Sequence, residues 1–226
     1  MKKISIKDVV EFRRKSDRSK RNFAMTLKLG KKRINLEGGG NYWITSISAI
    51  SNSYKLNDKQ PIINKKDELE EKYEAAEYKK TKIMYKRNID ILNRCEGFNL
   101  EKWRPSEKME FKKKYKDYST LDIEGLQIQV SPNHIFTFEN KGIKETGAIW
   151  FIAKLGGYKK EELGIFTDIL YRYLNFHFSE NYDVNPQYCI AVDVCSGTDI
   201  NYSQLMKEEI PQFLNSTIDE IKELMQ

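Results

Sequence analysis

The chain has 226 residues, 32% of them charged, and a formal net charge of +6. Its mean hydropathy of −0.68 is polar, but an aromatic content of 12% argues against disorder, because disordered chains contain few aromatic residues. The longest uninterrupted apolar run, 148–153, is far too short to span a bilayer, and no secretory leader pattern opens the chain. We therefore predict a folded, cytoplasmic protein with no membrane partner.

Charge is distributed unevenly along the chain. Residues 1–36 carry thirteen Lys and Arg against three acids, whereas residues 161–226 carry three against twelve. A basic segment supplies the sequence-independent attraction to phosphate that nucleic-acid-binding proteins use. It can equally pair with the acidic end of the same chain or of a second copy, and the sequence leaves this open. The candidate phosphate-facing residues are Arg13, Arg14, Lys15, Arg18, Lys20 and Arg21.

Helix signals dominate the first hundred residues. Ser5 and the acid three positions later resemble a capping box and predict a helix over 5–15. The triplet 38–40, Gly-Gly-Gly, fits no phosphate-binding motif and predicts a flexible joint. Residues 42–54 fit either a strand or a helix. Apolar residues recur at helical spacing over 67–94, which predicts one long helix capped by Gly97.

The stretch 126–199 predicts the sheet. Residues 126–138 read as one strand, the turn Glu-Asn-Lys-Gly follows, and 144–154 read as the next strand. Helical periodicity covers 159–178, and the apolar run at 187–197 predicts a further strand. Pro211 is expected to open a final helix. This order predicts an α/β fold, with α+β as the alternative, in which helices flank a central mixed sheet.

The residue types limit the chemistry. Only two histidines occur, with no HExxH motif and no convincing serine or cysteine triad. The three cysteines, Cys95, Cys189 and Cys195, lack CxxC spacing and are interpreted as reduced core thiols. What remains is chemistry built from carboxylates and lysine, which suits Mg²⁺-dependent phosphodiester hydrolysis.

Pro132-Asn133 near the start of one strand, the strand 147–154, the helix after it and the following strand with Asp193 resemble the core of the PD-(D/E)XK nuclease-like superfamily. The resemblance covers 67–226 and implies a restriction-endonuclease-like core. In that family a Pro-Asp on one strand and a Glu-x-Lys or Asp-x-Lys on the next bring together two carboxylates and a lysine. A glutamate from the preceding helix commonly joins them.

This chain departs from the family pattern. Asn133 stands where the family has an aspartate, and an amide brings no charge to a divalent ion. A literal Glu-Asn-Lys occurs at 139–141, but it falls in the predicted turn. Ala148 and Trp150 stand on the next strand, where the motif belongs. The catalytic motif is therefore interpreted as lost or relocated.

The candidate catalytic residues are Asp193, Asn133 and Lys154, and the candidate Mg²⁺ ligands are Asp193, Asn133 and Glu74. Asp193 lies in an apolar strand, where a carboxylate needs a partner or a function because burial of an unpaired charge is costly. Strand alternation predicts that it shares a face with Ala191 and Cys195.

These observations predict a basic amino-terminal extension, 1–60, packed on a nuclease-like core, 61–226. The functional hypothesis is a nuclease-fold protein that acts on or binds nucleic acid, in phage, mobile-element or defence biology, with the question of catalysis open. The alternative is a non-catalytic module that binds a protein partner, or a second copy of itself, through its oppositely charged ends.

Overall fold

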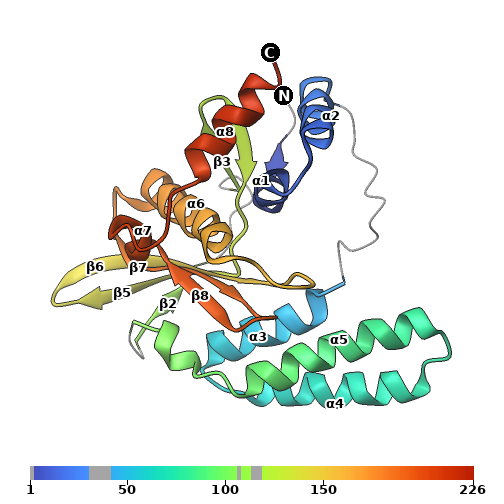
Figure 1. The fold of residues 1–226 in the computed structure, drawn as a ribbon. Coiled ribbons are helices and arrows are strands. Elements are labelled where there is room, and N and C mark those ends of the chain that lie inside the picture. Colours follow the sequence, from blue (N-terminus) through green and yellow to red (C-terminus); the bar gives the residue numbers. More distant parts are fainter. Residues whose placement is uncertain (1–2, 31–41, 106–107, 113–118) are drawn as a thin grey trace.

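The computed structural model describes residues 3–30, 42–105, 108–112 and 119–226 (Figure 1). The expected glycine joint at 38–40 lies outside the described residues, as do residues 113–118, which include three lysines. The helices are α1 Ile6–Arg13, α2 Asp17–Lys28, α3 Ile44–Leu56, α4 Gln60–Ala75, α5 Lys79–Glu96, η1 Leu100–Trp103, α6 Lys160–Phe178, α7 Tyr202–Met206 and α8 Leu214–Glu223. The strands are β1 Ile4–Ser5, β2 Glu110–Phe111, β3 Thr120–Ile123, β4 Leu126–Gln129, β5 His134–Asn140, β6 Ile143–Ile152, β7 Asp183–Asp193 and β8 Thr198–Asn201.

A five-stranded mixed sheet forms the centre of the fold. Its strands are ordered β2-β5-β6-β7-β8, and only the β6–β7 pair is parallel. A parallel pair needs a long connection, because the chain must return to the starting edge of the sheet, and α6 provides it. The predicted mixed α/β fold is thus confirmed, and the carboxyl ends of β6 and β7 meet beside the amino end of α6.

Both faces of this sheet are buried. Successive side chains of a strand point to opposite faces, so neighbouring residues enter two different apolar clusters. Ile135, Ala148 and Trp150 face a cluster that includes α1, α6 and α8, whereas Phe136 and Phe151 face a second cluster that includes α3 and α5. Each large side chain removed from water contributes about 1.5–3 kcal/mol to folding. Helices therefore cover the sheet on two sides (Figure 1).

The expected strand over 126–138 is in fact two strands in two sheets. β4 belongs to a three-stranded sheet of order β1-β4-β3, and β5 begins only at His134. Pro132, which lacks an amide hydrogen for a ladder bond, lies in the connection between them. The single-strand prediction was wrong because both halves are rich in apolar residues, although β4 alternates buried and exposed residues and β5 is buried on both faces.

The predicted single helix over 67–94 is also wrong. The structure has an antiparallel pair, α4 and α5, with the extended residues Ala76 and Tyr78 at the break (Figure 1). Residues 75–78 contain neither Gly nor Pro, so no local signal marks the turn. Folding back lets Leu69 of α4 and Leu92 of α5 enter the same buried cluster.

Other boundaries follow local signals more closely. Ser5 caps α1 by accepting a hydrogen bond from the Asp8 amide at 3.1 Å, and Gly97 is the carboxyl cap of α5, as predicted. α6 begins one residue after the expected start and ends at the expected Phe178. The final helix begins at Leu214, three residues beyond Pro211.

The first sixty residues do not form one layer. α1 and α2 pack with α6 and α8 on one face of the main sheet, whereas α3 lies on the other face. The expected boundary at residue 60 falls between α3 and α4, which share a buried cluster. No helix within the described residues is both long and apolar enough to cross a membrane.

Candidate functional site

Asp193, at the carboxyl end of β7, is fully buried and completely hydrogen-bonded. Its carboxylate accepts from the Tyr158 amide at 2.8 Å, from the Cys195 amide at 2.9 Å and from the Ser196 hydroxyl at 2.9 Å. Three donors supply what a buried carboxylate needs. Asp193 therefore joins the loop before α6 to the turn after β7. It shares the α6 face with Ala191, but Cys195 packs with the opposite cluster because the strand has already ended.

Asn133 also has a structural partner. Its side-chain oxygen accepts a hydrogen bond from the Phe151 amide at 2.8 Å, and its own amide donates to the Ile149 carbonyl at 3.0 Å. The Asn133 side-chain oxygen thus takes the place of a backbone carbonyl and extends the β5–β6 hydrogen bonding by one bond. Ala148 and Trp150, at the motif positions of β6, lie in the closed apolar cluster, and Trp150 packs edge-to-face on Phe166 with the ring centroids 5.5 Å apart.

The other predicted ligands do not join Asp193. Lys154 pairs with Glu11 of α1, and Glu74 is exposed on α4, which packs with α3 and α5. Among the described residues, no group of three or more His, Cys, Asp or Glu side chains is placed to hold a metal ion. The predicted ligand set therefore does not fit a magnesium centre.

Half of the predicted phosphate-facing residues are used inside the chain. Arg14 forms two hydrogen bonds with the Glu162 carboxylate, and Lys20 lies 2.7 Å from the Glu220 carboxylate. Arg13 donates to the Thr217 hydroxyl at 3.0 Å. The basic amino-terminal helices thus dock on the acidic carboxyl-terminal third of the same molecule, which is one of the alternatives that the sequence left open.

Arg14 and Glu162 hold each other in the charged state. Burial acts to raise the pKa of Glu162, but hydrogen bonds from Arg14 and from the Lys159 amide outweigh it, so the pKa is lowered. The same contact raises the pKa of Arg14. This ion pair fixes the end of α1 against the first turn of α6.

The remaining three residues of the predicted surface stay available. Arg18 and Arg21 are exposed on α2, and Lys15 is half-buried just before it. Among the described residues, none of the three forms an ion pair with a carboxylate. They form a smaller basic surface than the sequence predicted.

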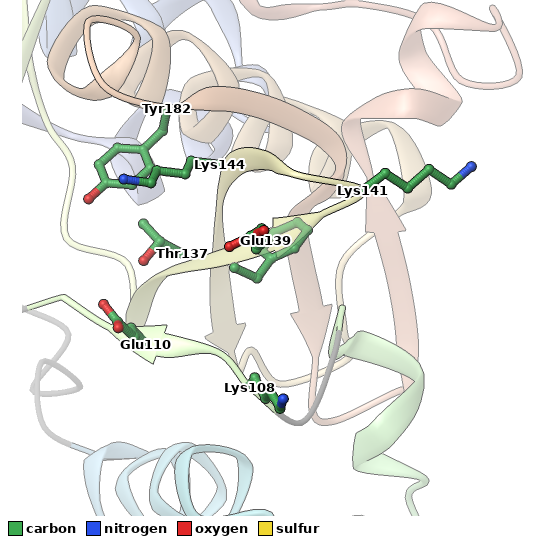
Figure 2. Close-up of a pocket in the computed structure, with 8 residues that line it drawn as sticks. Lys108, Glu110, Thr137, Glu139, Lys141, Lys144 and Tyr182 are labelled. Atoms are coloured by element: carbon green, nitrogen blue, oxygen red, sulfur yellow. The ribbon is translucent and has the colours of Figure 1, made fainter.

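An open cavity of about 760 Å³ lies at the hairpin end of β5 and β6 (Figure 2). It will be called the edge cavity. Its described lining residues are Lys108, Glu110, Thr137, Phe138, Glu139, Lys141, Lys144 and Tyr182. The strand register explains the convergence: Glu110 lies opposite Thr137, and Glu139 lies opposite Lys144, so these polar residues share one face of the sheet.

Lysines outnumber acids around the edge cavity. Lys108 and Lys144 are exposed, and the Lys141 side chain extends outward from the turn (Figure 2). Lys112 stands beside them, with its ammonium 5.2 Å from the centre of the Tyr182 ring. A hydrogen bond with Tyr182, and the nearby Glu110 carboxylate to a lesser degree, raise the pKa of Lys112. Lys112 also pairs with the Glu110 carboxylate at 3.5 Å, whereas among the described residues no carboxylate pairs with Lys108, Lys141 or Lys144.

The sequence indicates part of this site. It predicts a turn at Glu-Asn-Lys-Gly 139–142, whereas the structure keeps Glu139 and Asn140 in β5 and turns at Lys141 and Gly142, with Lys141 at φ 50°. The register that brings Lys108 and Glu110 beside these residues depends on β2, a two-residue strand with no recognisable pattern.

Comparison of the chain with protein-family models, with curated proteins and with solved structures finds no match in any of the three. The functional argument therefore rests on the chemistry and geometry described above.

Proposed function

We propose that the protein binds nucleic acid through the edge cavity and does not use a metal centre at the family motif positions. The proposal combines a nuclease-like order of strands, in which a hairpin is followed by a helical crossover to a parallel strand, with the loss of the motif charges. Ala148 and Trp150 leave no open polar surface at those positions. Catalysis at that place would need ligands in a region that is packed like any protein core.

The observation that carries the proposal is the set of three lysines, Lys108, Lys141 and Lys144, that line the edge cavity. A nucleic-acid backbone is a regular array of single negative charges, and a protein binds it by replacing condensed counterions with lysine and arginine. Lys108 comes from the segment before β2, and Lys141 and Lys144 come from the β5–β6 hairpin, yet all three line one open space. A charge arrangement of this kind fits an extended polyanion better than a single carboxylate.

Self-association through oppositely charged ends has less support. Arg14 and Lys20, two of the charges that such an interface would use, already pair with Glu162 and Glu220 of the same chain. A second copy would have to break these intramolecular pairs before forming equivalent ones, with little net gain in free energy.

Binding of fluorescently labelled single- and double-stranded DNA and RNA tests the proposal. The triple variant Lys108→Glu, Lys141→Glu, Lys144→Glu is expected to lose about tenfold or more in affinity at moderate salt, since removing phosphate contacts weakens binding. Because all three residues are exposed, the melting temperature should stay near that of the unaltered protein.

The matched control is the triple variant Lys55→Glu, Lys80→Glu, Lys207→Glu. These lysines are also exposed, lie away from the edge cavity and change the net charge by the same amount. Equal loss of affinity in both variants would show a non-specific charge effect and would refute a site at the edge cavity. No binding by the unaltered protein to any of the four nucleic acids would refute the function itself.

One observation favours a second candidate function, metal-dependent cleavage by relocated carboxylates. Glu110 and Glu139 both line the edge cavity, with Lys144 directly across the strand pair from Glu139. Two carboxylates and a lysine are the residue types that phosphodiester hydrolysis with Mg²⁺ requires.

Incubation of the same nucleic acids with Mg²⁺ or Mn²⁺, with and without chelator, separates the two functions. Binding without cleavage supports the main proposal. Metal-dependent cleavage that is abolished in the double variant Glu110→Gln, Glu139→Gln, but retained with Asp193→Asn, would instead establish a nuclease with its active site in the edge cavity.

A further inference from the structure

A second cavity, of about 610 Å³, lies at the opposite end of β6, where the chain crosses over into α6. It will be called the crossover pocket. Arg13 and Arg14 line it from the end of α1, residues 156–159 line it from the connection between β6 and α6, and Phe213 lines it from the residue before α8. In mixed α/β sheets, the space beyond the carboxyl ends of parallel strands is a common place for ligands.

Arg13 is held in position, but no counter-ion for it is found among the described residues. Its guanidinium stacks over the Phe213 ring, 3.9 Å from the ring centre, and donates to the buried Thr217 hydroxyl at 3.0 Å. Within the described residues, no carboxylate forms an ion pair with it. A guanidinium has five donor hydrogens in a fixed plane, so one bond to Thr217 leaves most of its hydrogen-bonding capacity for a ligand.

Arg14 has a different role in the same pocket. It is neutralised by Glu162 and also donates to the Gly157 carbonyl at 3.3 Å, so it fixes the loop and is not free for a ligand. Because the Glu162 carboxylate accepts the Lys159 amide hydrogen, the first turn of α6 is already capped. The positive charge left over in the pocket comes from Arg13 and the exposed Lys159, against the single acid Glu161.

The loop leaves Gly156 accessible beside the pocket, whereas the amides of Gly157, Tyr158 and Lys159 already donate within the chain. Gly156 and Gly157 have φ values of 81° and 75°, which side-chain-bearing residues rarely adopt, and nothing lies within 4 Å of a β-carbon built on Gly156. At Gly157, by contrast, a β-carbon would come within 2.9 Å of the Asp193 carboxylate. Asp193 therefore positions this loop, with Gly157 closely packed on it and Gly156 left accessible.

We infer that the crossover pocket binds a phosphomonoester, with Arg13 and Lys159 as the charged contacts. A phosphomonoester carries nearly two negative charges and three acceptor oxygens at neutral pH, which suits a planar arginine that lacks a carboxylate partner. The pocket is much larger than a lone phosphate and lies within the size range of small-molecule sites, so it can accommodate a nucleoside attached to the phosphate. A free nucleotide and the 5′ end of a nucleic-acid strand share this chemistry.

The site is separate from the edge cavity, and its test does not require nucleic-acid binding there. Thermal unfolding with sodium phosphate or AMP, compared with sodium chloride at equal ionic strength, should show a rise in melting temperature that grows with concentration, because a ligand that binds only the folded state stabilises it. Arg13→Gln should weaken the apparent affinity at least about tenfold. Arg18→Gln makes the same chemical change on the exposed surface of α2 and should change the affinity less than about twofold.

Lys159→Gln provides a second variant at an exposed side chain, so the melting temperature without ligand should stay near that of the unaltered protein. It should weaken binding of AMP by a smaller factor than Arg13→Gln. The inference is overturned if phosphate and AMP stabilise no more than chloride does, or if neither Arg13→Gln nor Lys159→Gln weakens binding.

Competition distinguishes the two sources of the phosphomonoester. A single-stranded oligonucleotide with a 5′-phosphate that displaces AMP, when the same oligonucleotide with a 5′-hydroxyl does not, identifies a strand end as the ligand. If AMP binds and neither oligonucleotide displaces it, the ligand of the crossover pocket is a free nucleotide. Inorganic phosphate and AMP are not polynucleotides, so their binding to the crossover pocket does not depend on nucleic-acid binding at the edge cavity. If the edge cavity binds no nucleic acid, the test of the crossover pocket still stands.

Discussion

The two ends of strand β6 differ in how they use charge. At the carboxyl end, Asp193 accepts three hydrogen bonds from its own chain, Lys154 pairs with Glu11, and Glu162 pairs with Arg14. At the hairpin end, lysines from separate segments surround an open cavity. The residues that looked most catalytic in the sequence therefore hold the fold together, whereas residues that looked like ordinary solvated turn charges converge.

This difference has a physical basis. A buried charge is tolerated only with partners, so an isolated polar residue in an apolar strand indicates a structural hydrogen-bond network as readily as an active site. Exposed lysines carry no such requirement and remain available to a ligand. Burial of a polar residue alone is therefore a poor guide to catalysis in this chain.

The largest expected effect is on the carboxyl end. Asp193→Ala should lower the free energy of unfolding by about 2–4 kcal/mol, because it removes a fully buried carboxylate and leaves two part-buried amides and the Ser196 hydroxyl without their acceptor. Urea unfolding measures the change. Affinity for nucleic acid should be unaltered under conditions where the variant is folded. If affinity falls while stability does not, the roles assigned to the two ends are reversed.

The middle of β6 connects the two ends through close backbone packing. A β-carbon at Gly147 would come within 2.6 Å of the Tyr188 β-carbon and 2.7 Å of the Tyr188 carbonyl oxygen on β7. Gly147→Ala should therefore cost about 1–3 kcal/mol of stability. Gly97→Ala is the control, since φ there is −77° and the nearest atom is at an ordinary 3.4 Å. Equal stability of the two variants in thermal unfolding would contradict the register described for β6 and β7.

The hairpin end should respond to salt in a graded way. Removal of one phosphate contact lowers the slope of log affinity against log salt by about 0.9 for duplex DNA and about 0.7 for single strands. Lys144→Gln removes at most one phosphate contact, so the magnitude of the slope should fall by no more than about 0.9 for duplex DNA. The triple variant removes at most three contacts, so the fall should be up to three times as large. An unchanged slope in both variants, measured by titration at several salt concentrations, places the binding surface elsewhere.

The smallest expected effect is the pH dependence of the α1–α6 ion pair. The pKa of Glu162 is lowered below its ordinary 4.5, so in acid the unfolded chain takes up a proton before the folded chain does. The stabilisation is therefore complete above pH 4.5 and is lost as pH falls through the folded-state pKa. In Glu162→Gln, denaturant unfolding should show a weaker decline in stability with acid than the unaltered protein. Glu161→Gln, which removes a neighbouring acid and leaves the Arg14–Glu162 pair in place, is the matched control for the change in charge.

Much of the fold could be predicted because its signals are local. Apolar spacing predicts the helix over 159–178 to within one residue, and residue types predict the hairpin turn, which the structure confines to residues 141–142. The break between α4 and α5 could not be predicted, since residues 75–78 favour a helix and only packing of the two halves against α3 reverses the chain.

The sequence by itself determined the central mixed sheet, the crossover helix, the apolar character of the motif positions and the opposite charges of the two ends. Tertiary structure alone decided which charges meet: Arg14 and Glu162 are 148 residues apart in the chain, and Glu11 and Lys154 are 143 apart. Periodicity acts within a few turns or one strand, whereas these contacts depend on the docking of whole elements. For the same reason Asp193, the most conspicuous polar residue of the sequence, is shown by its surroundings to position a loop.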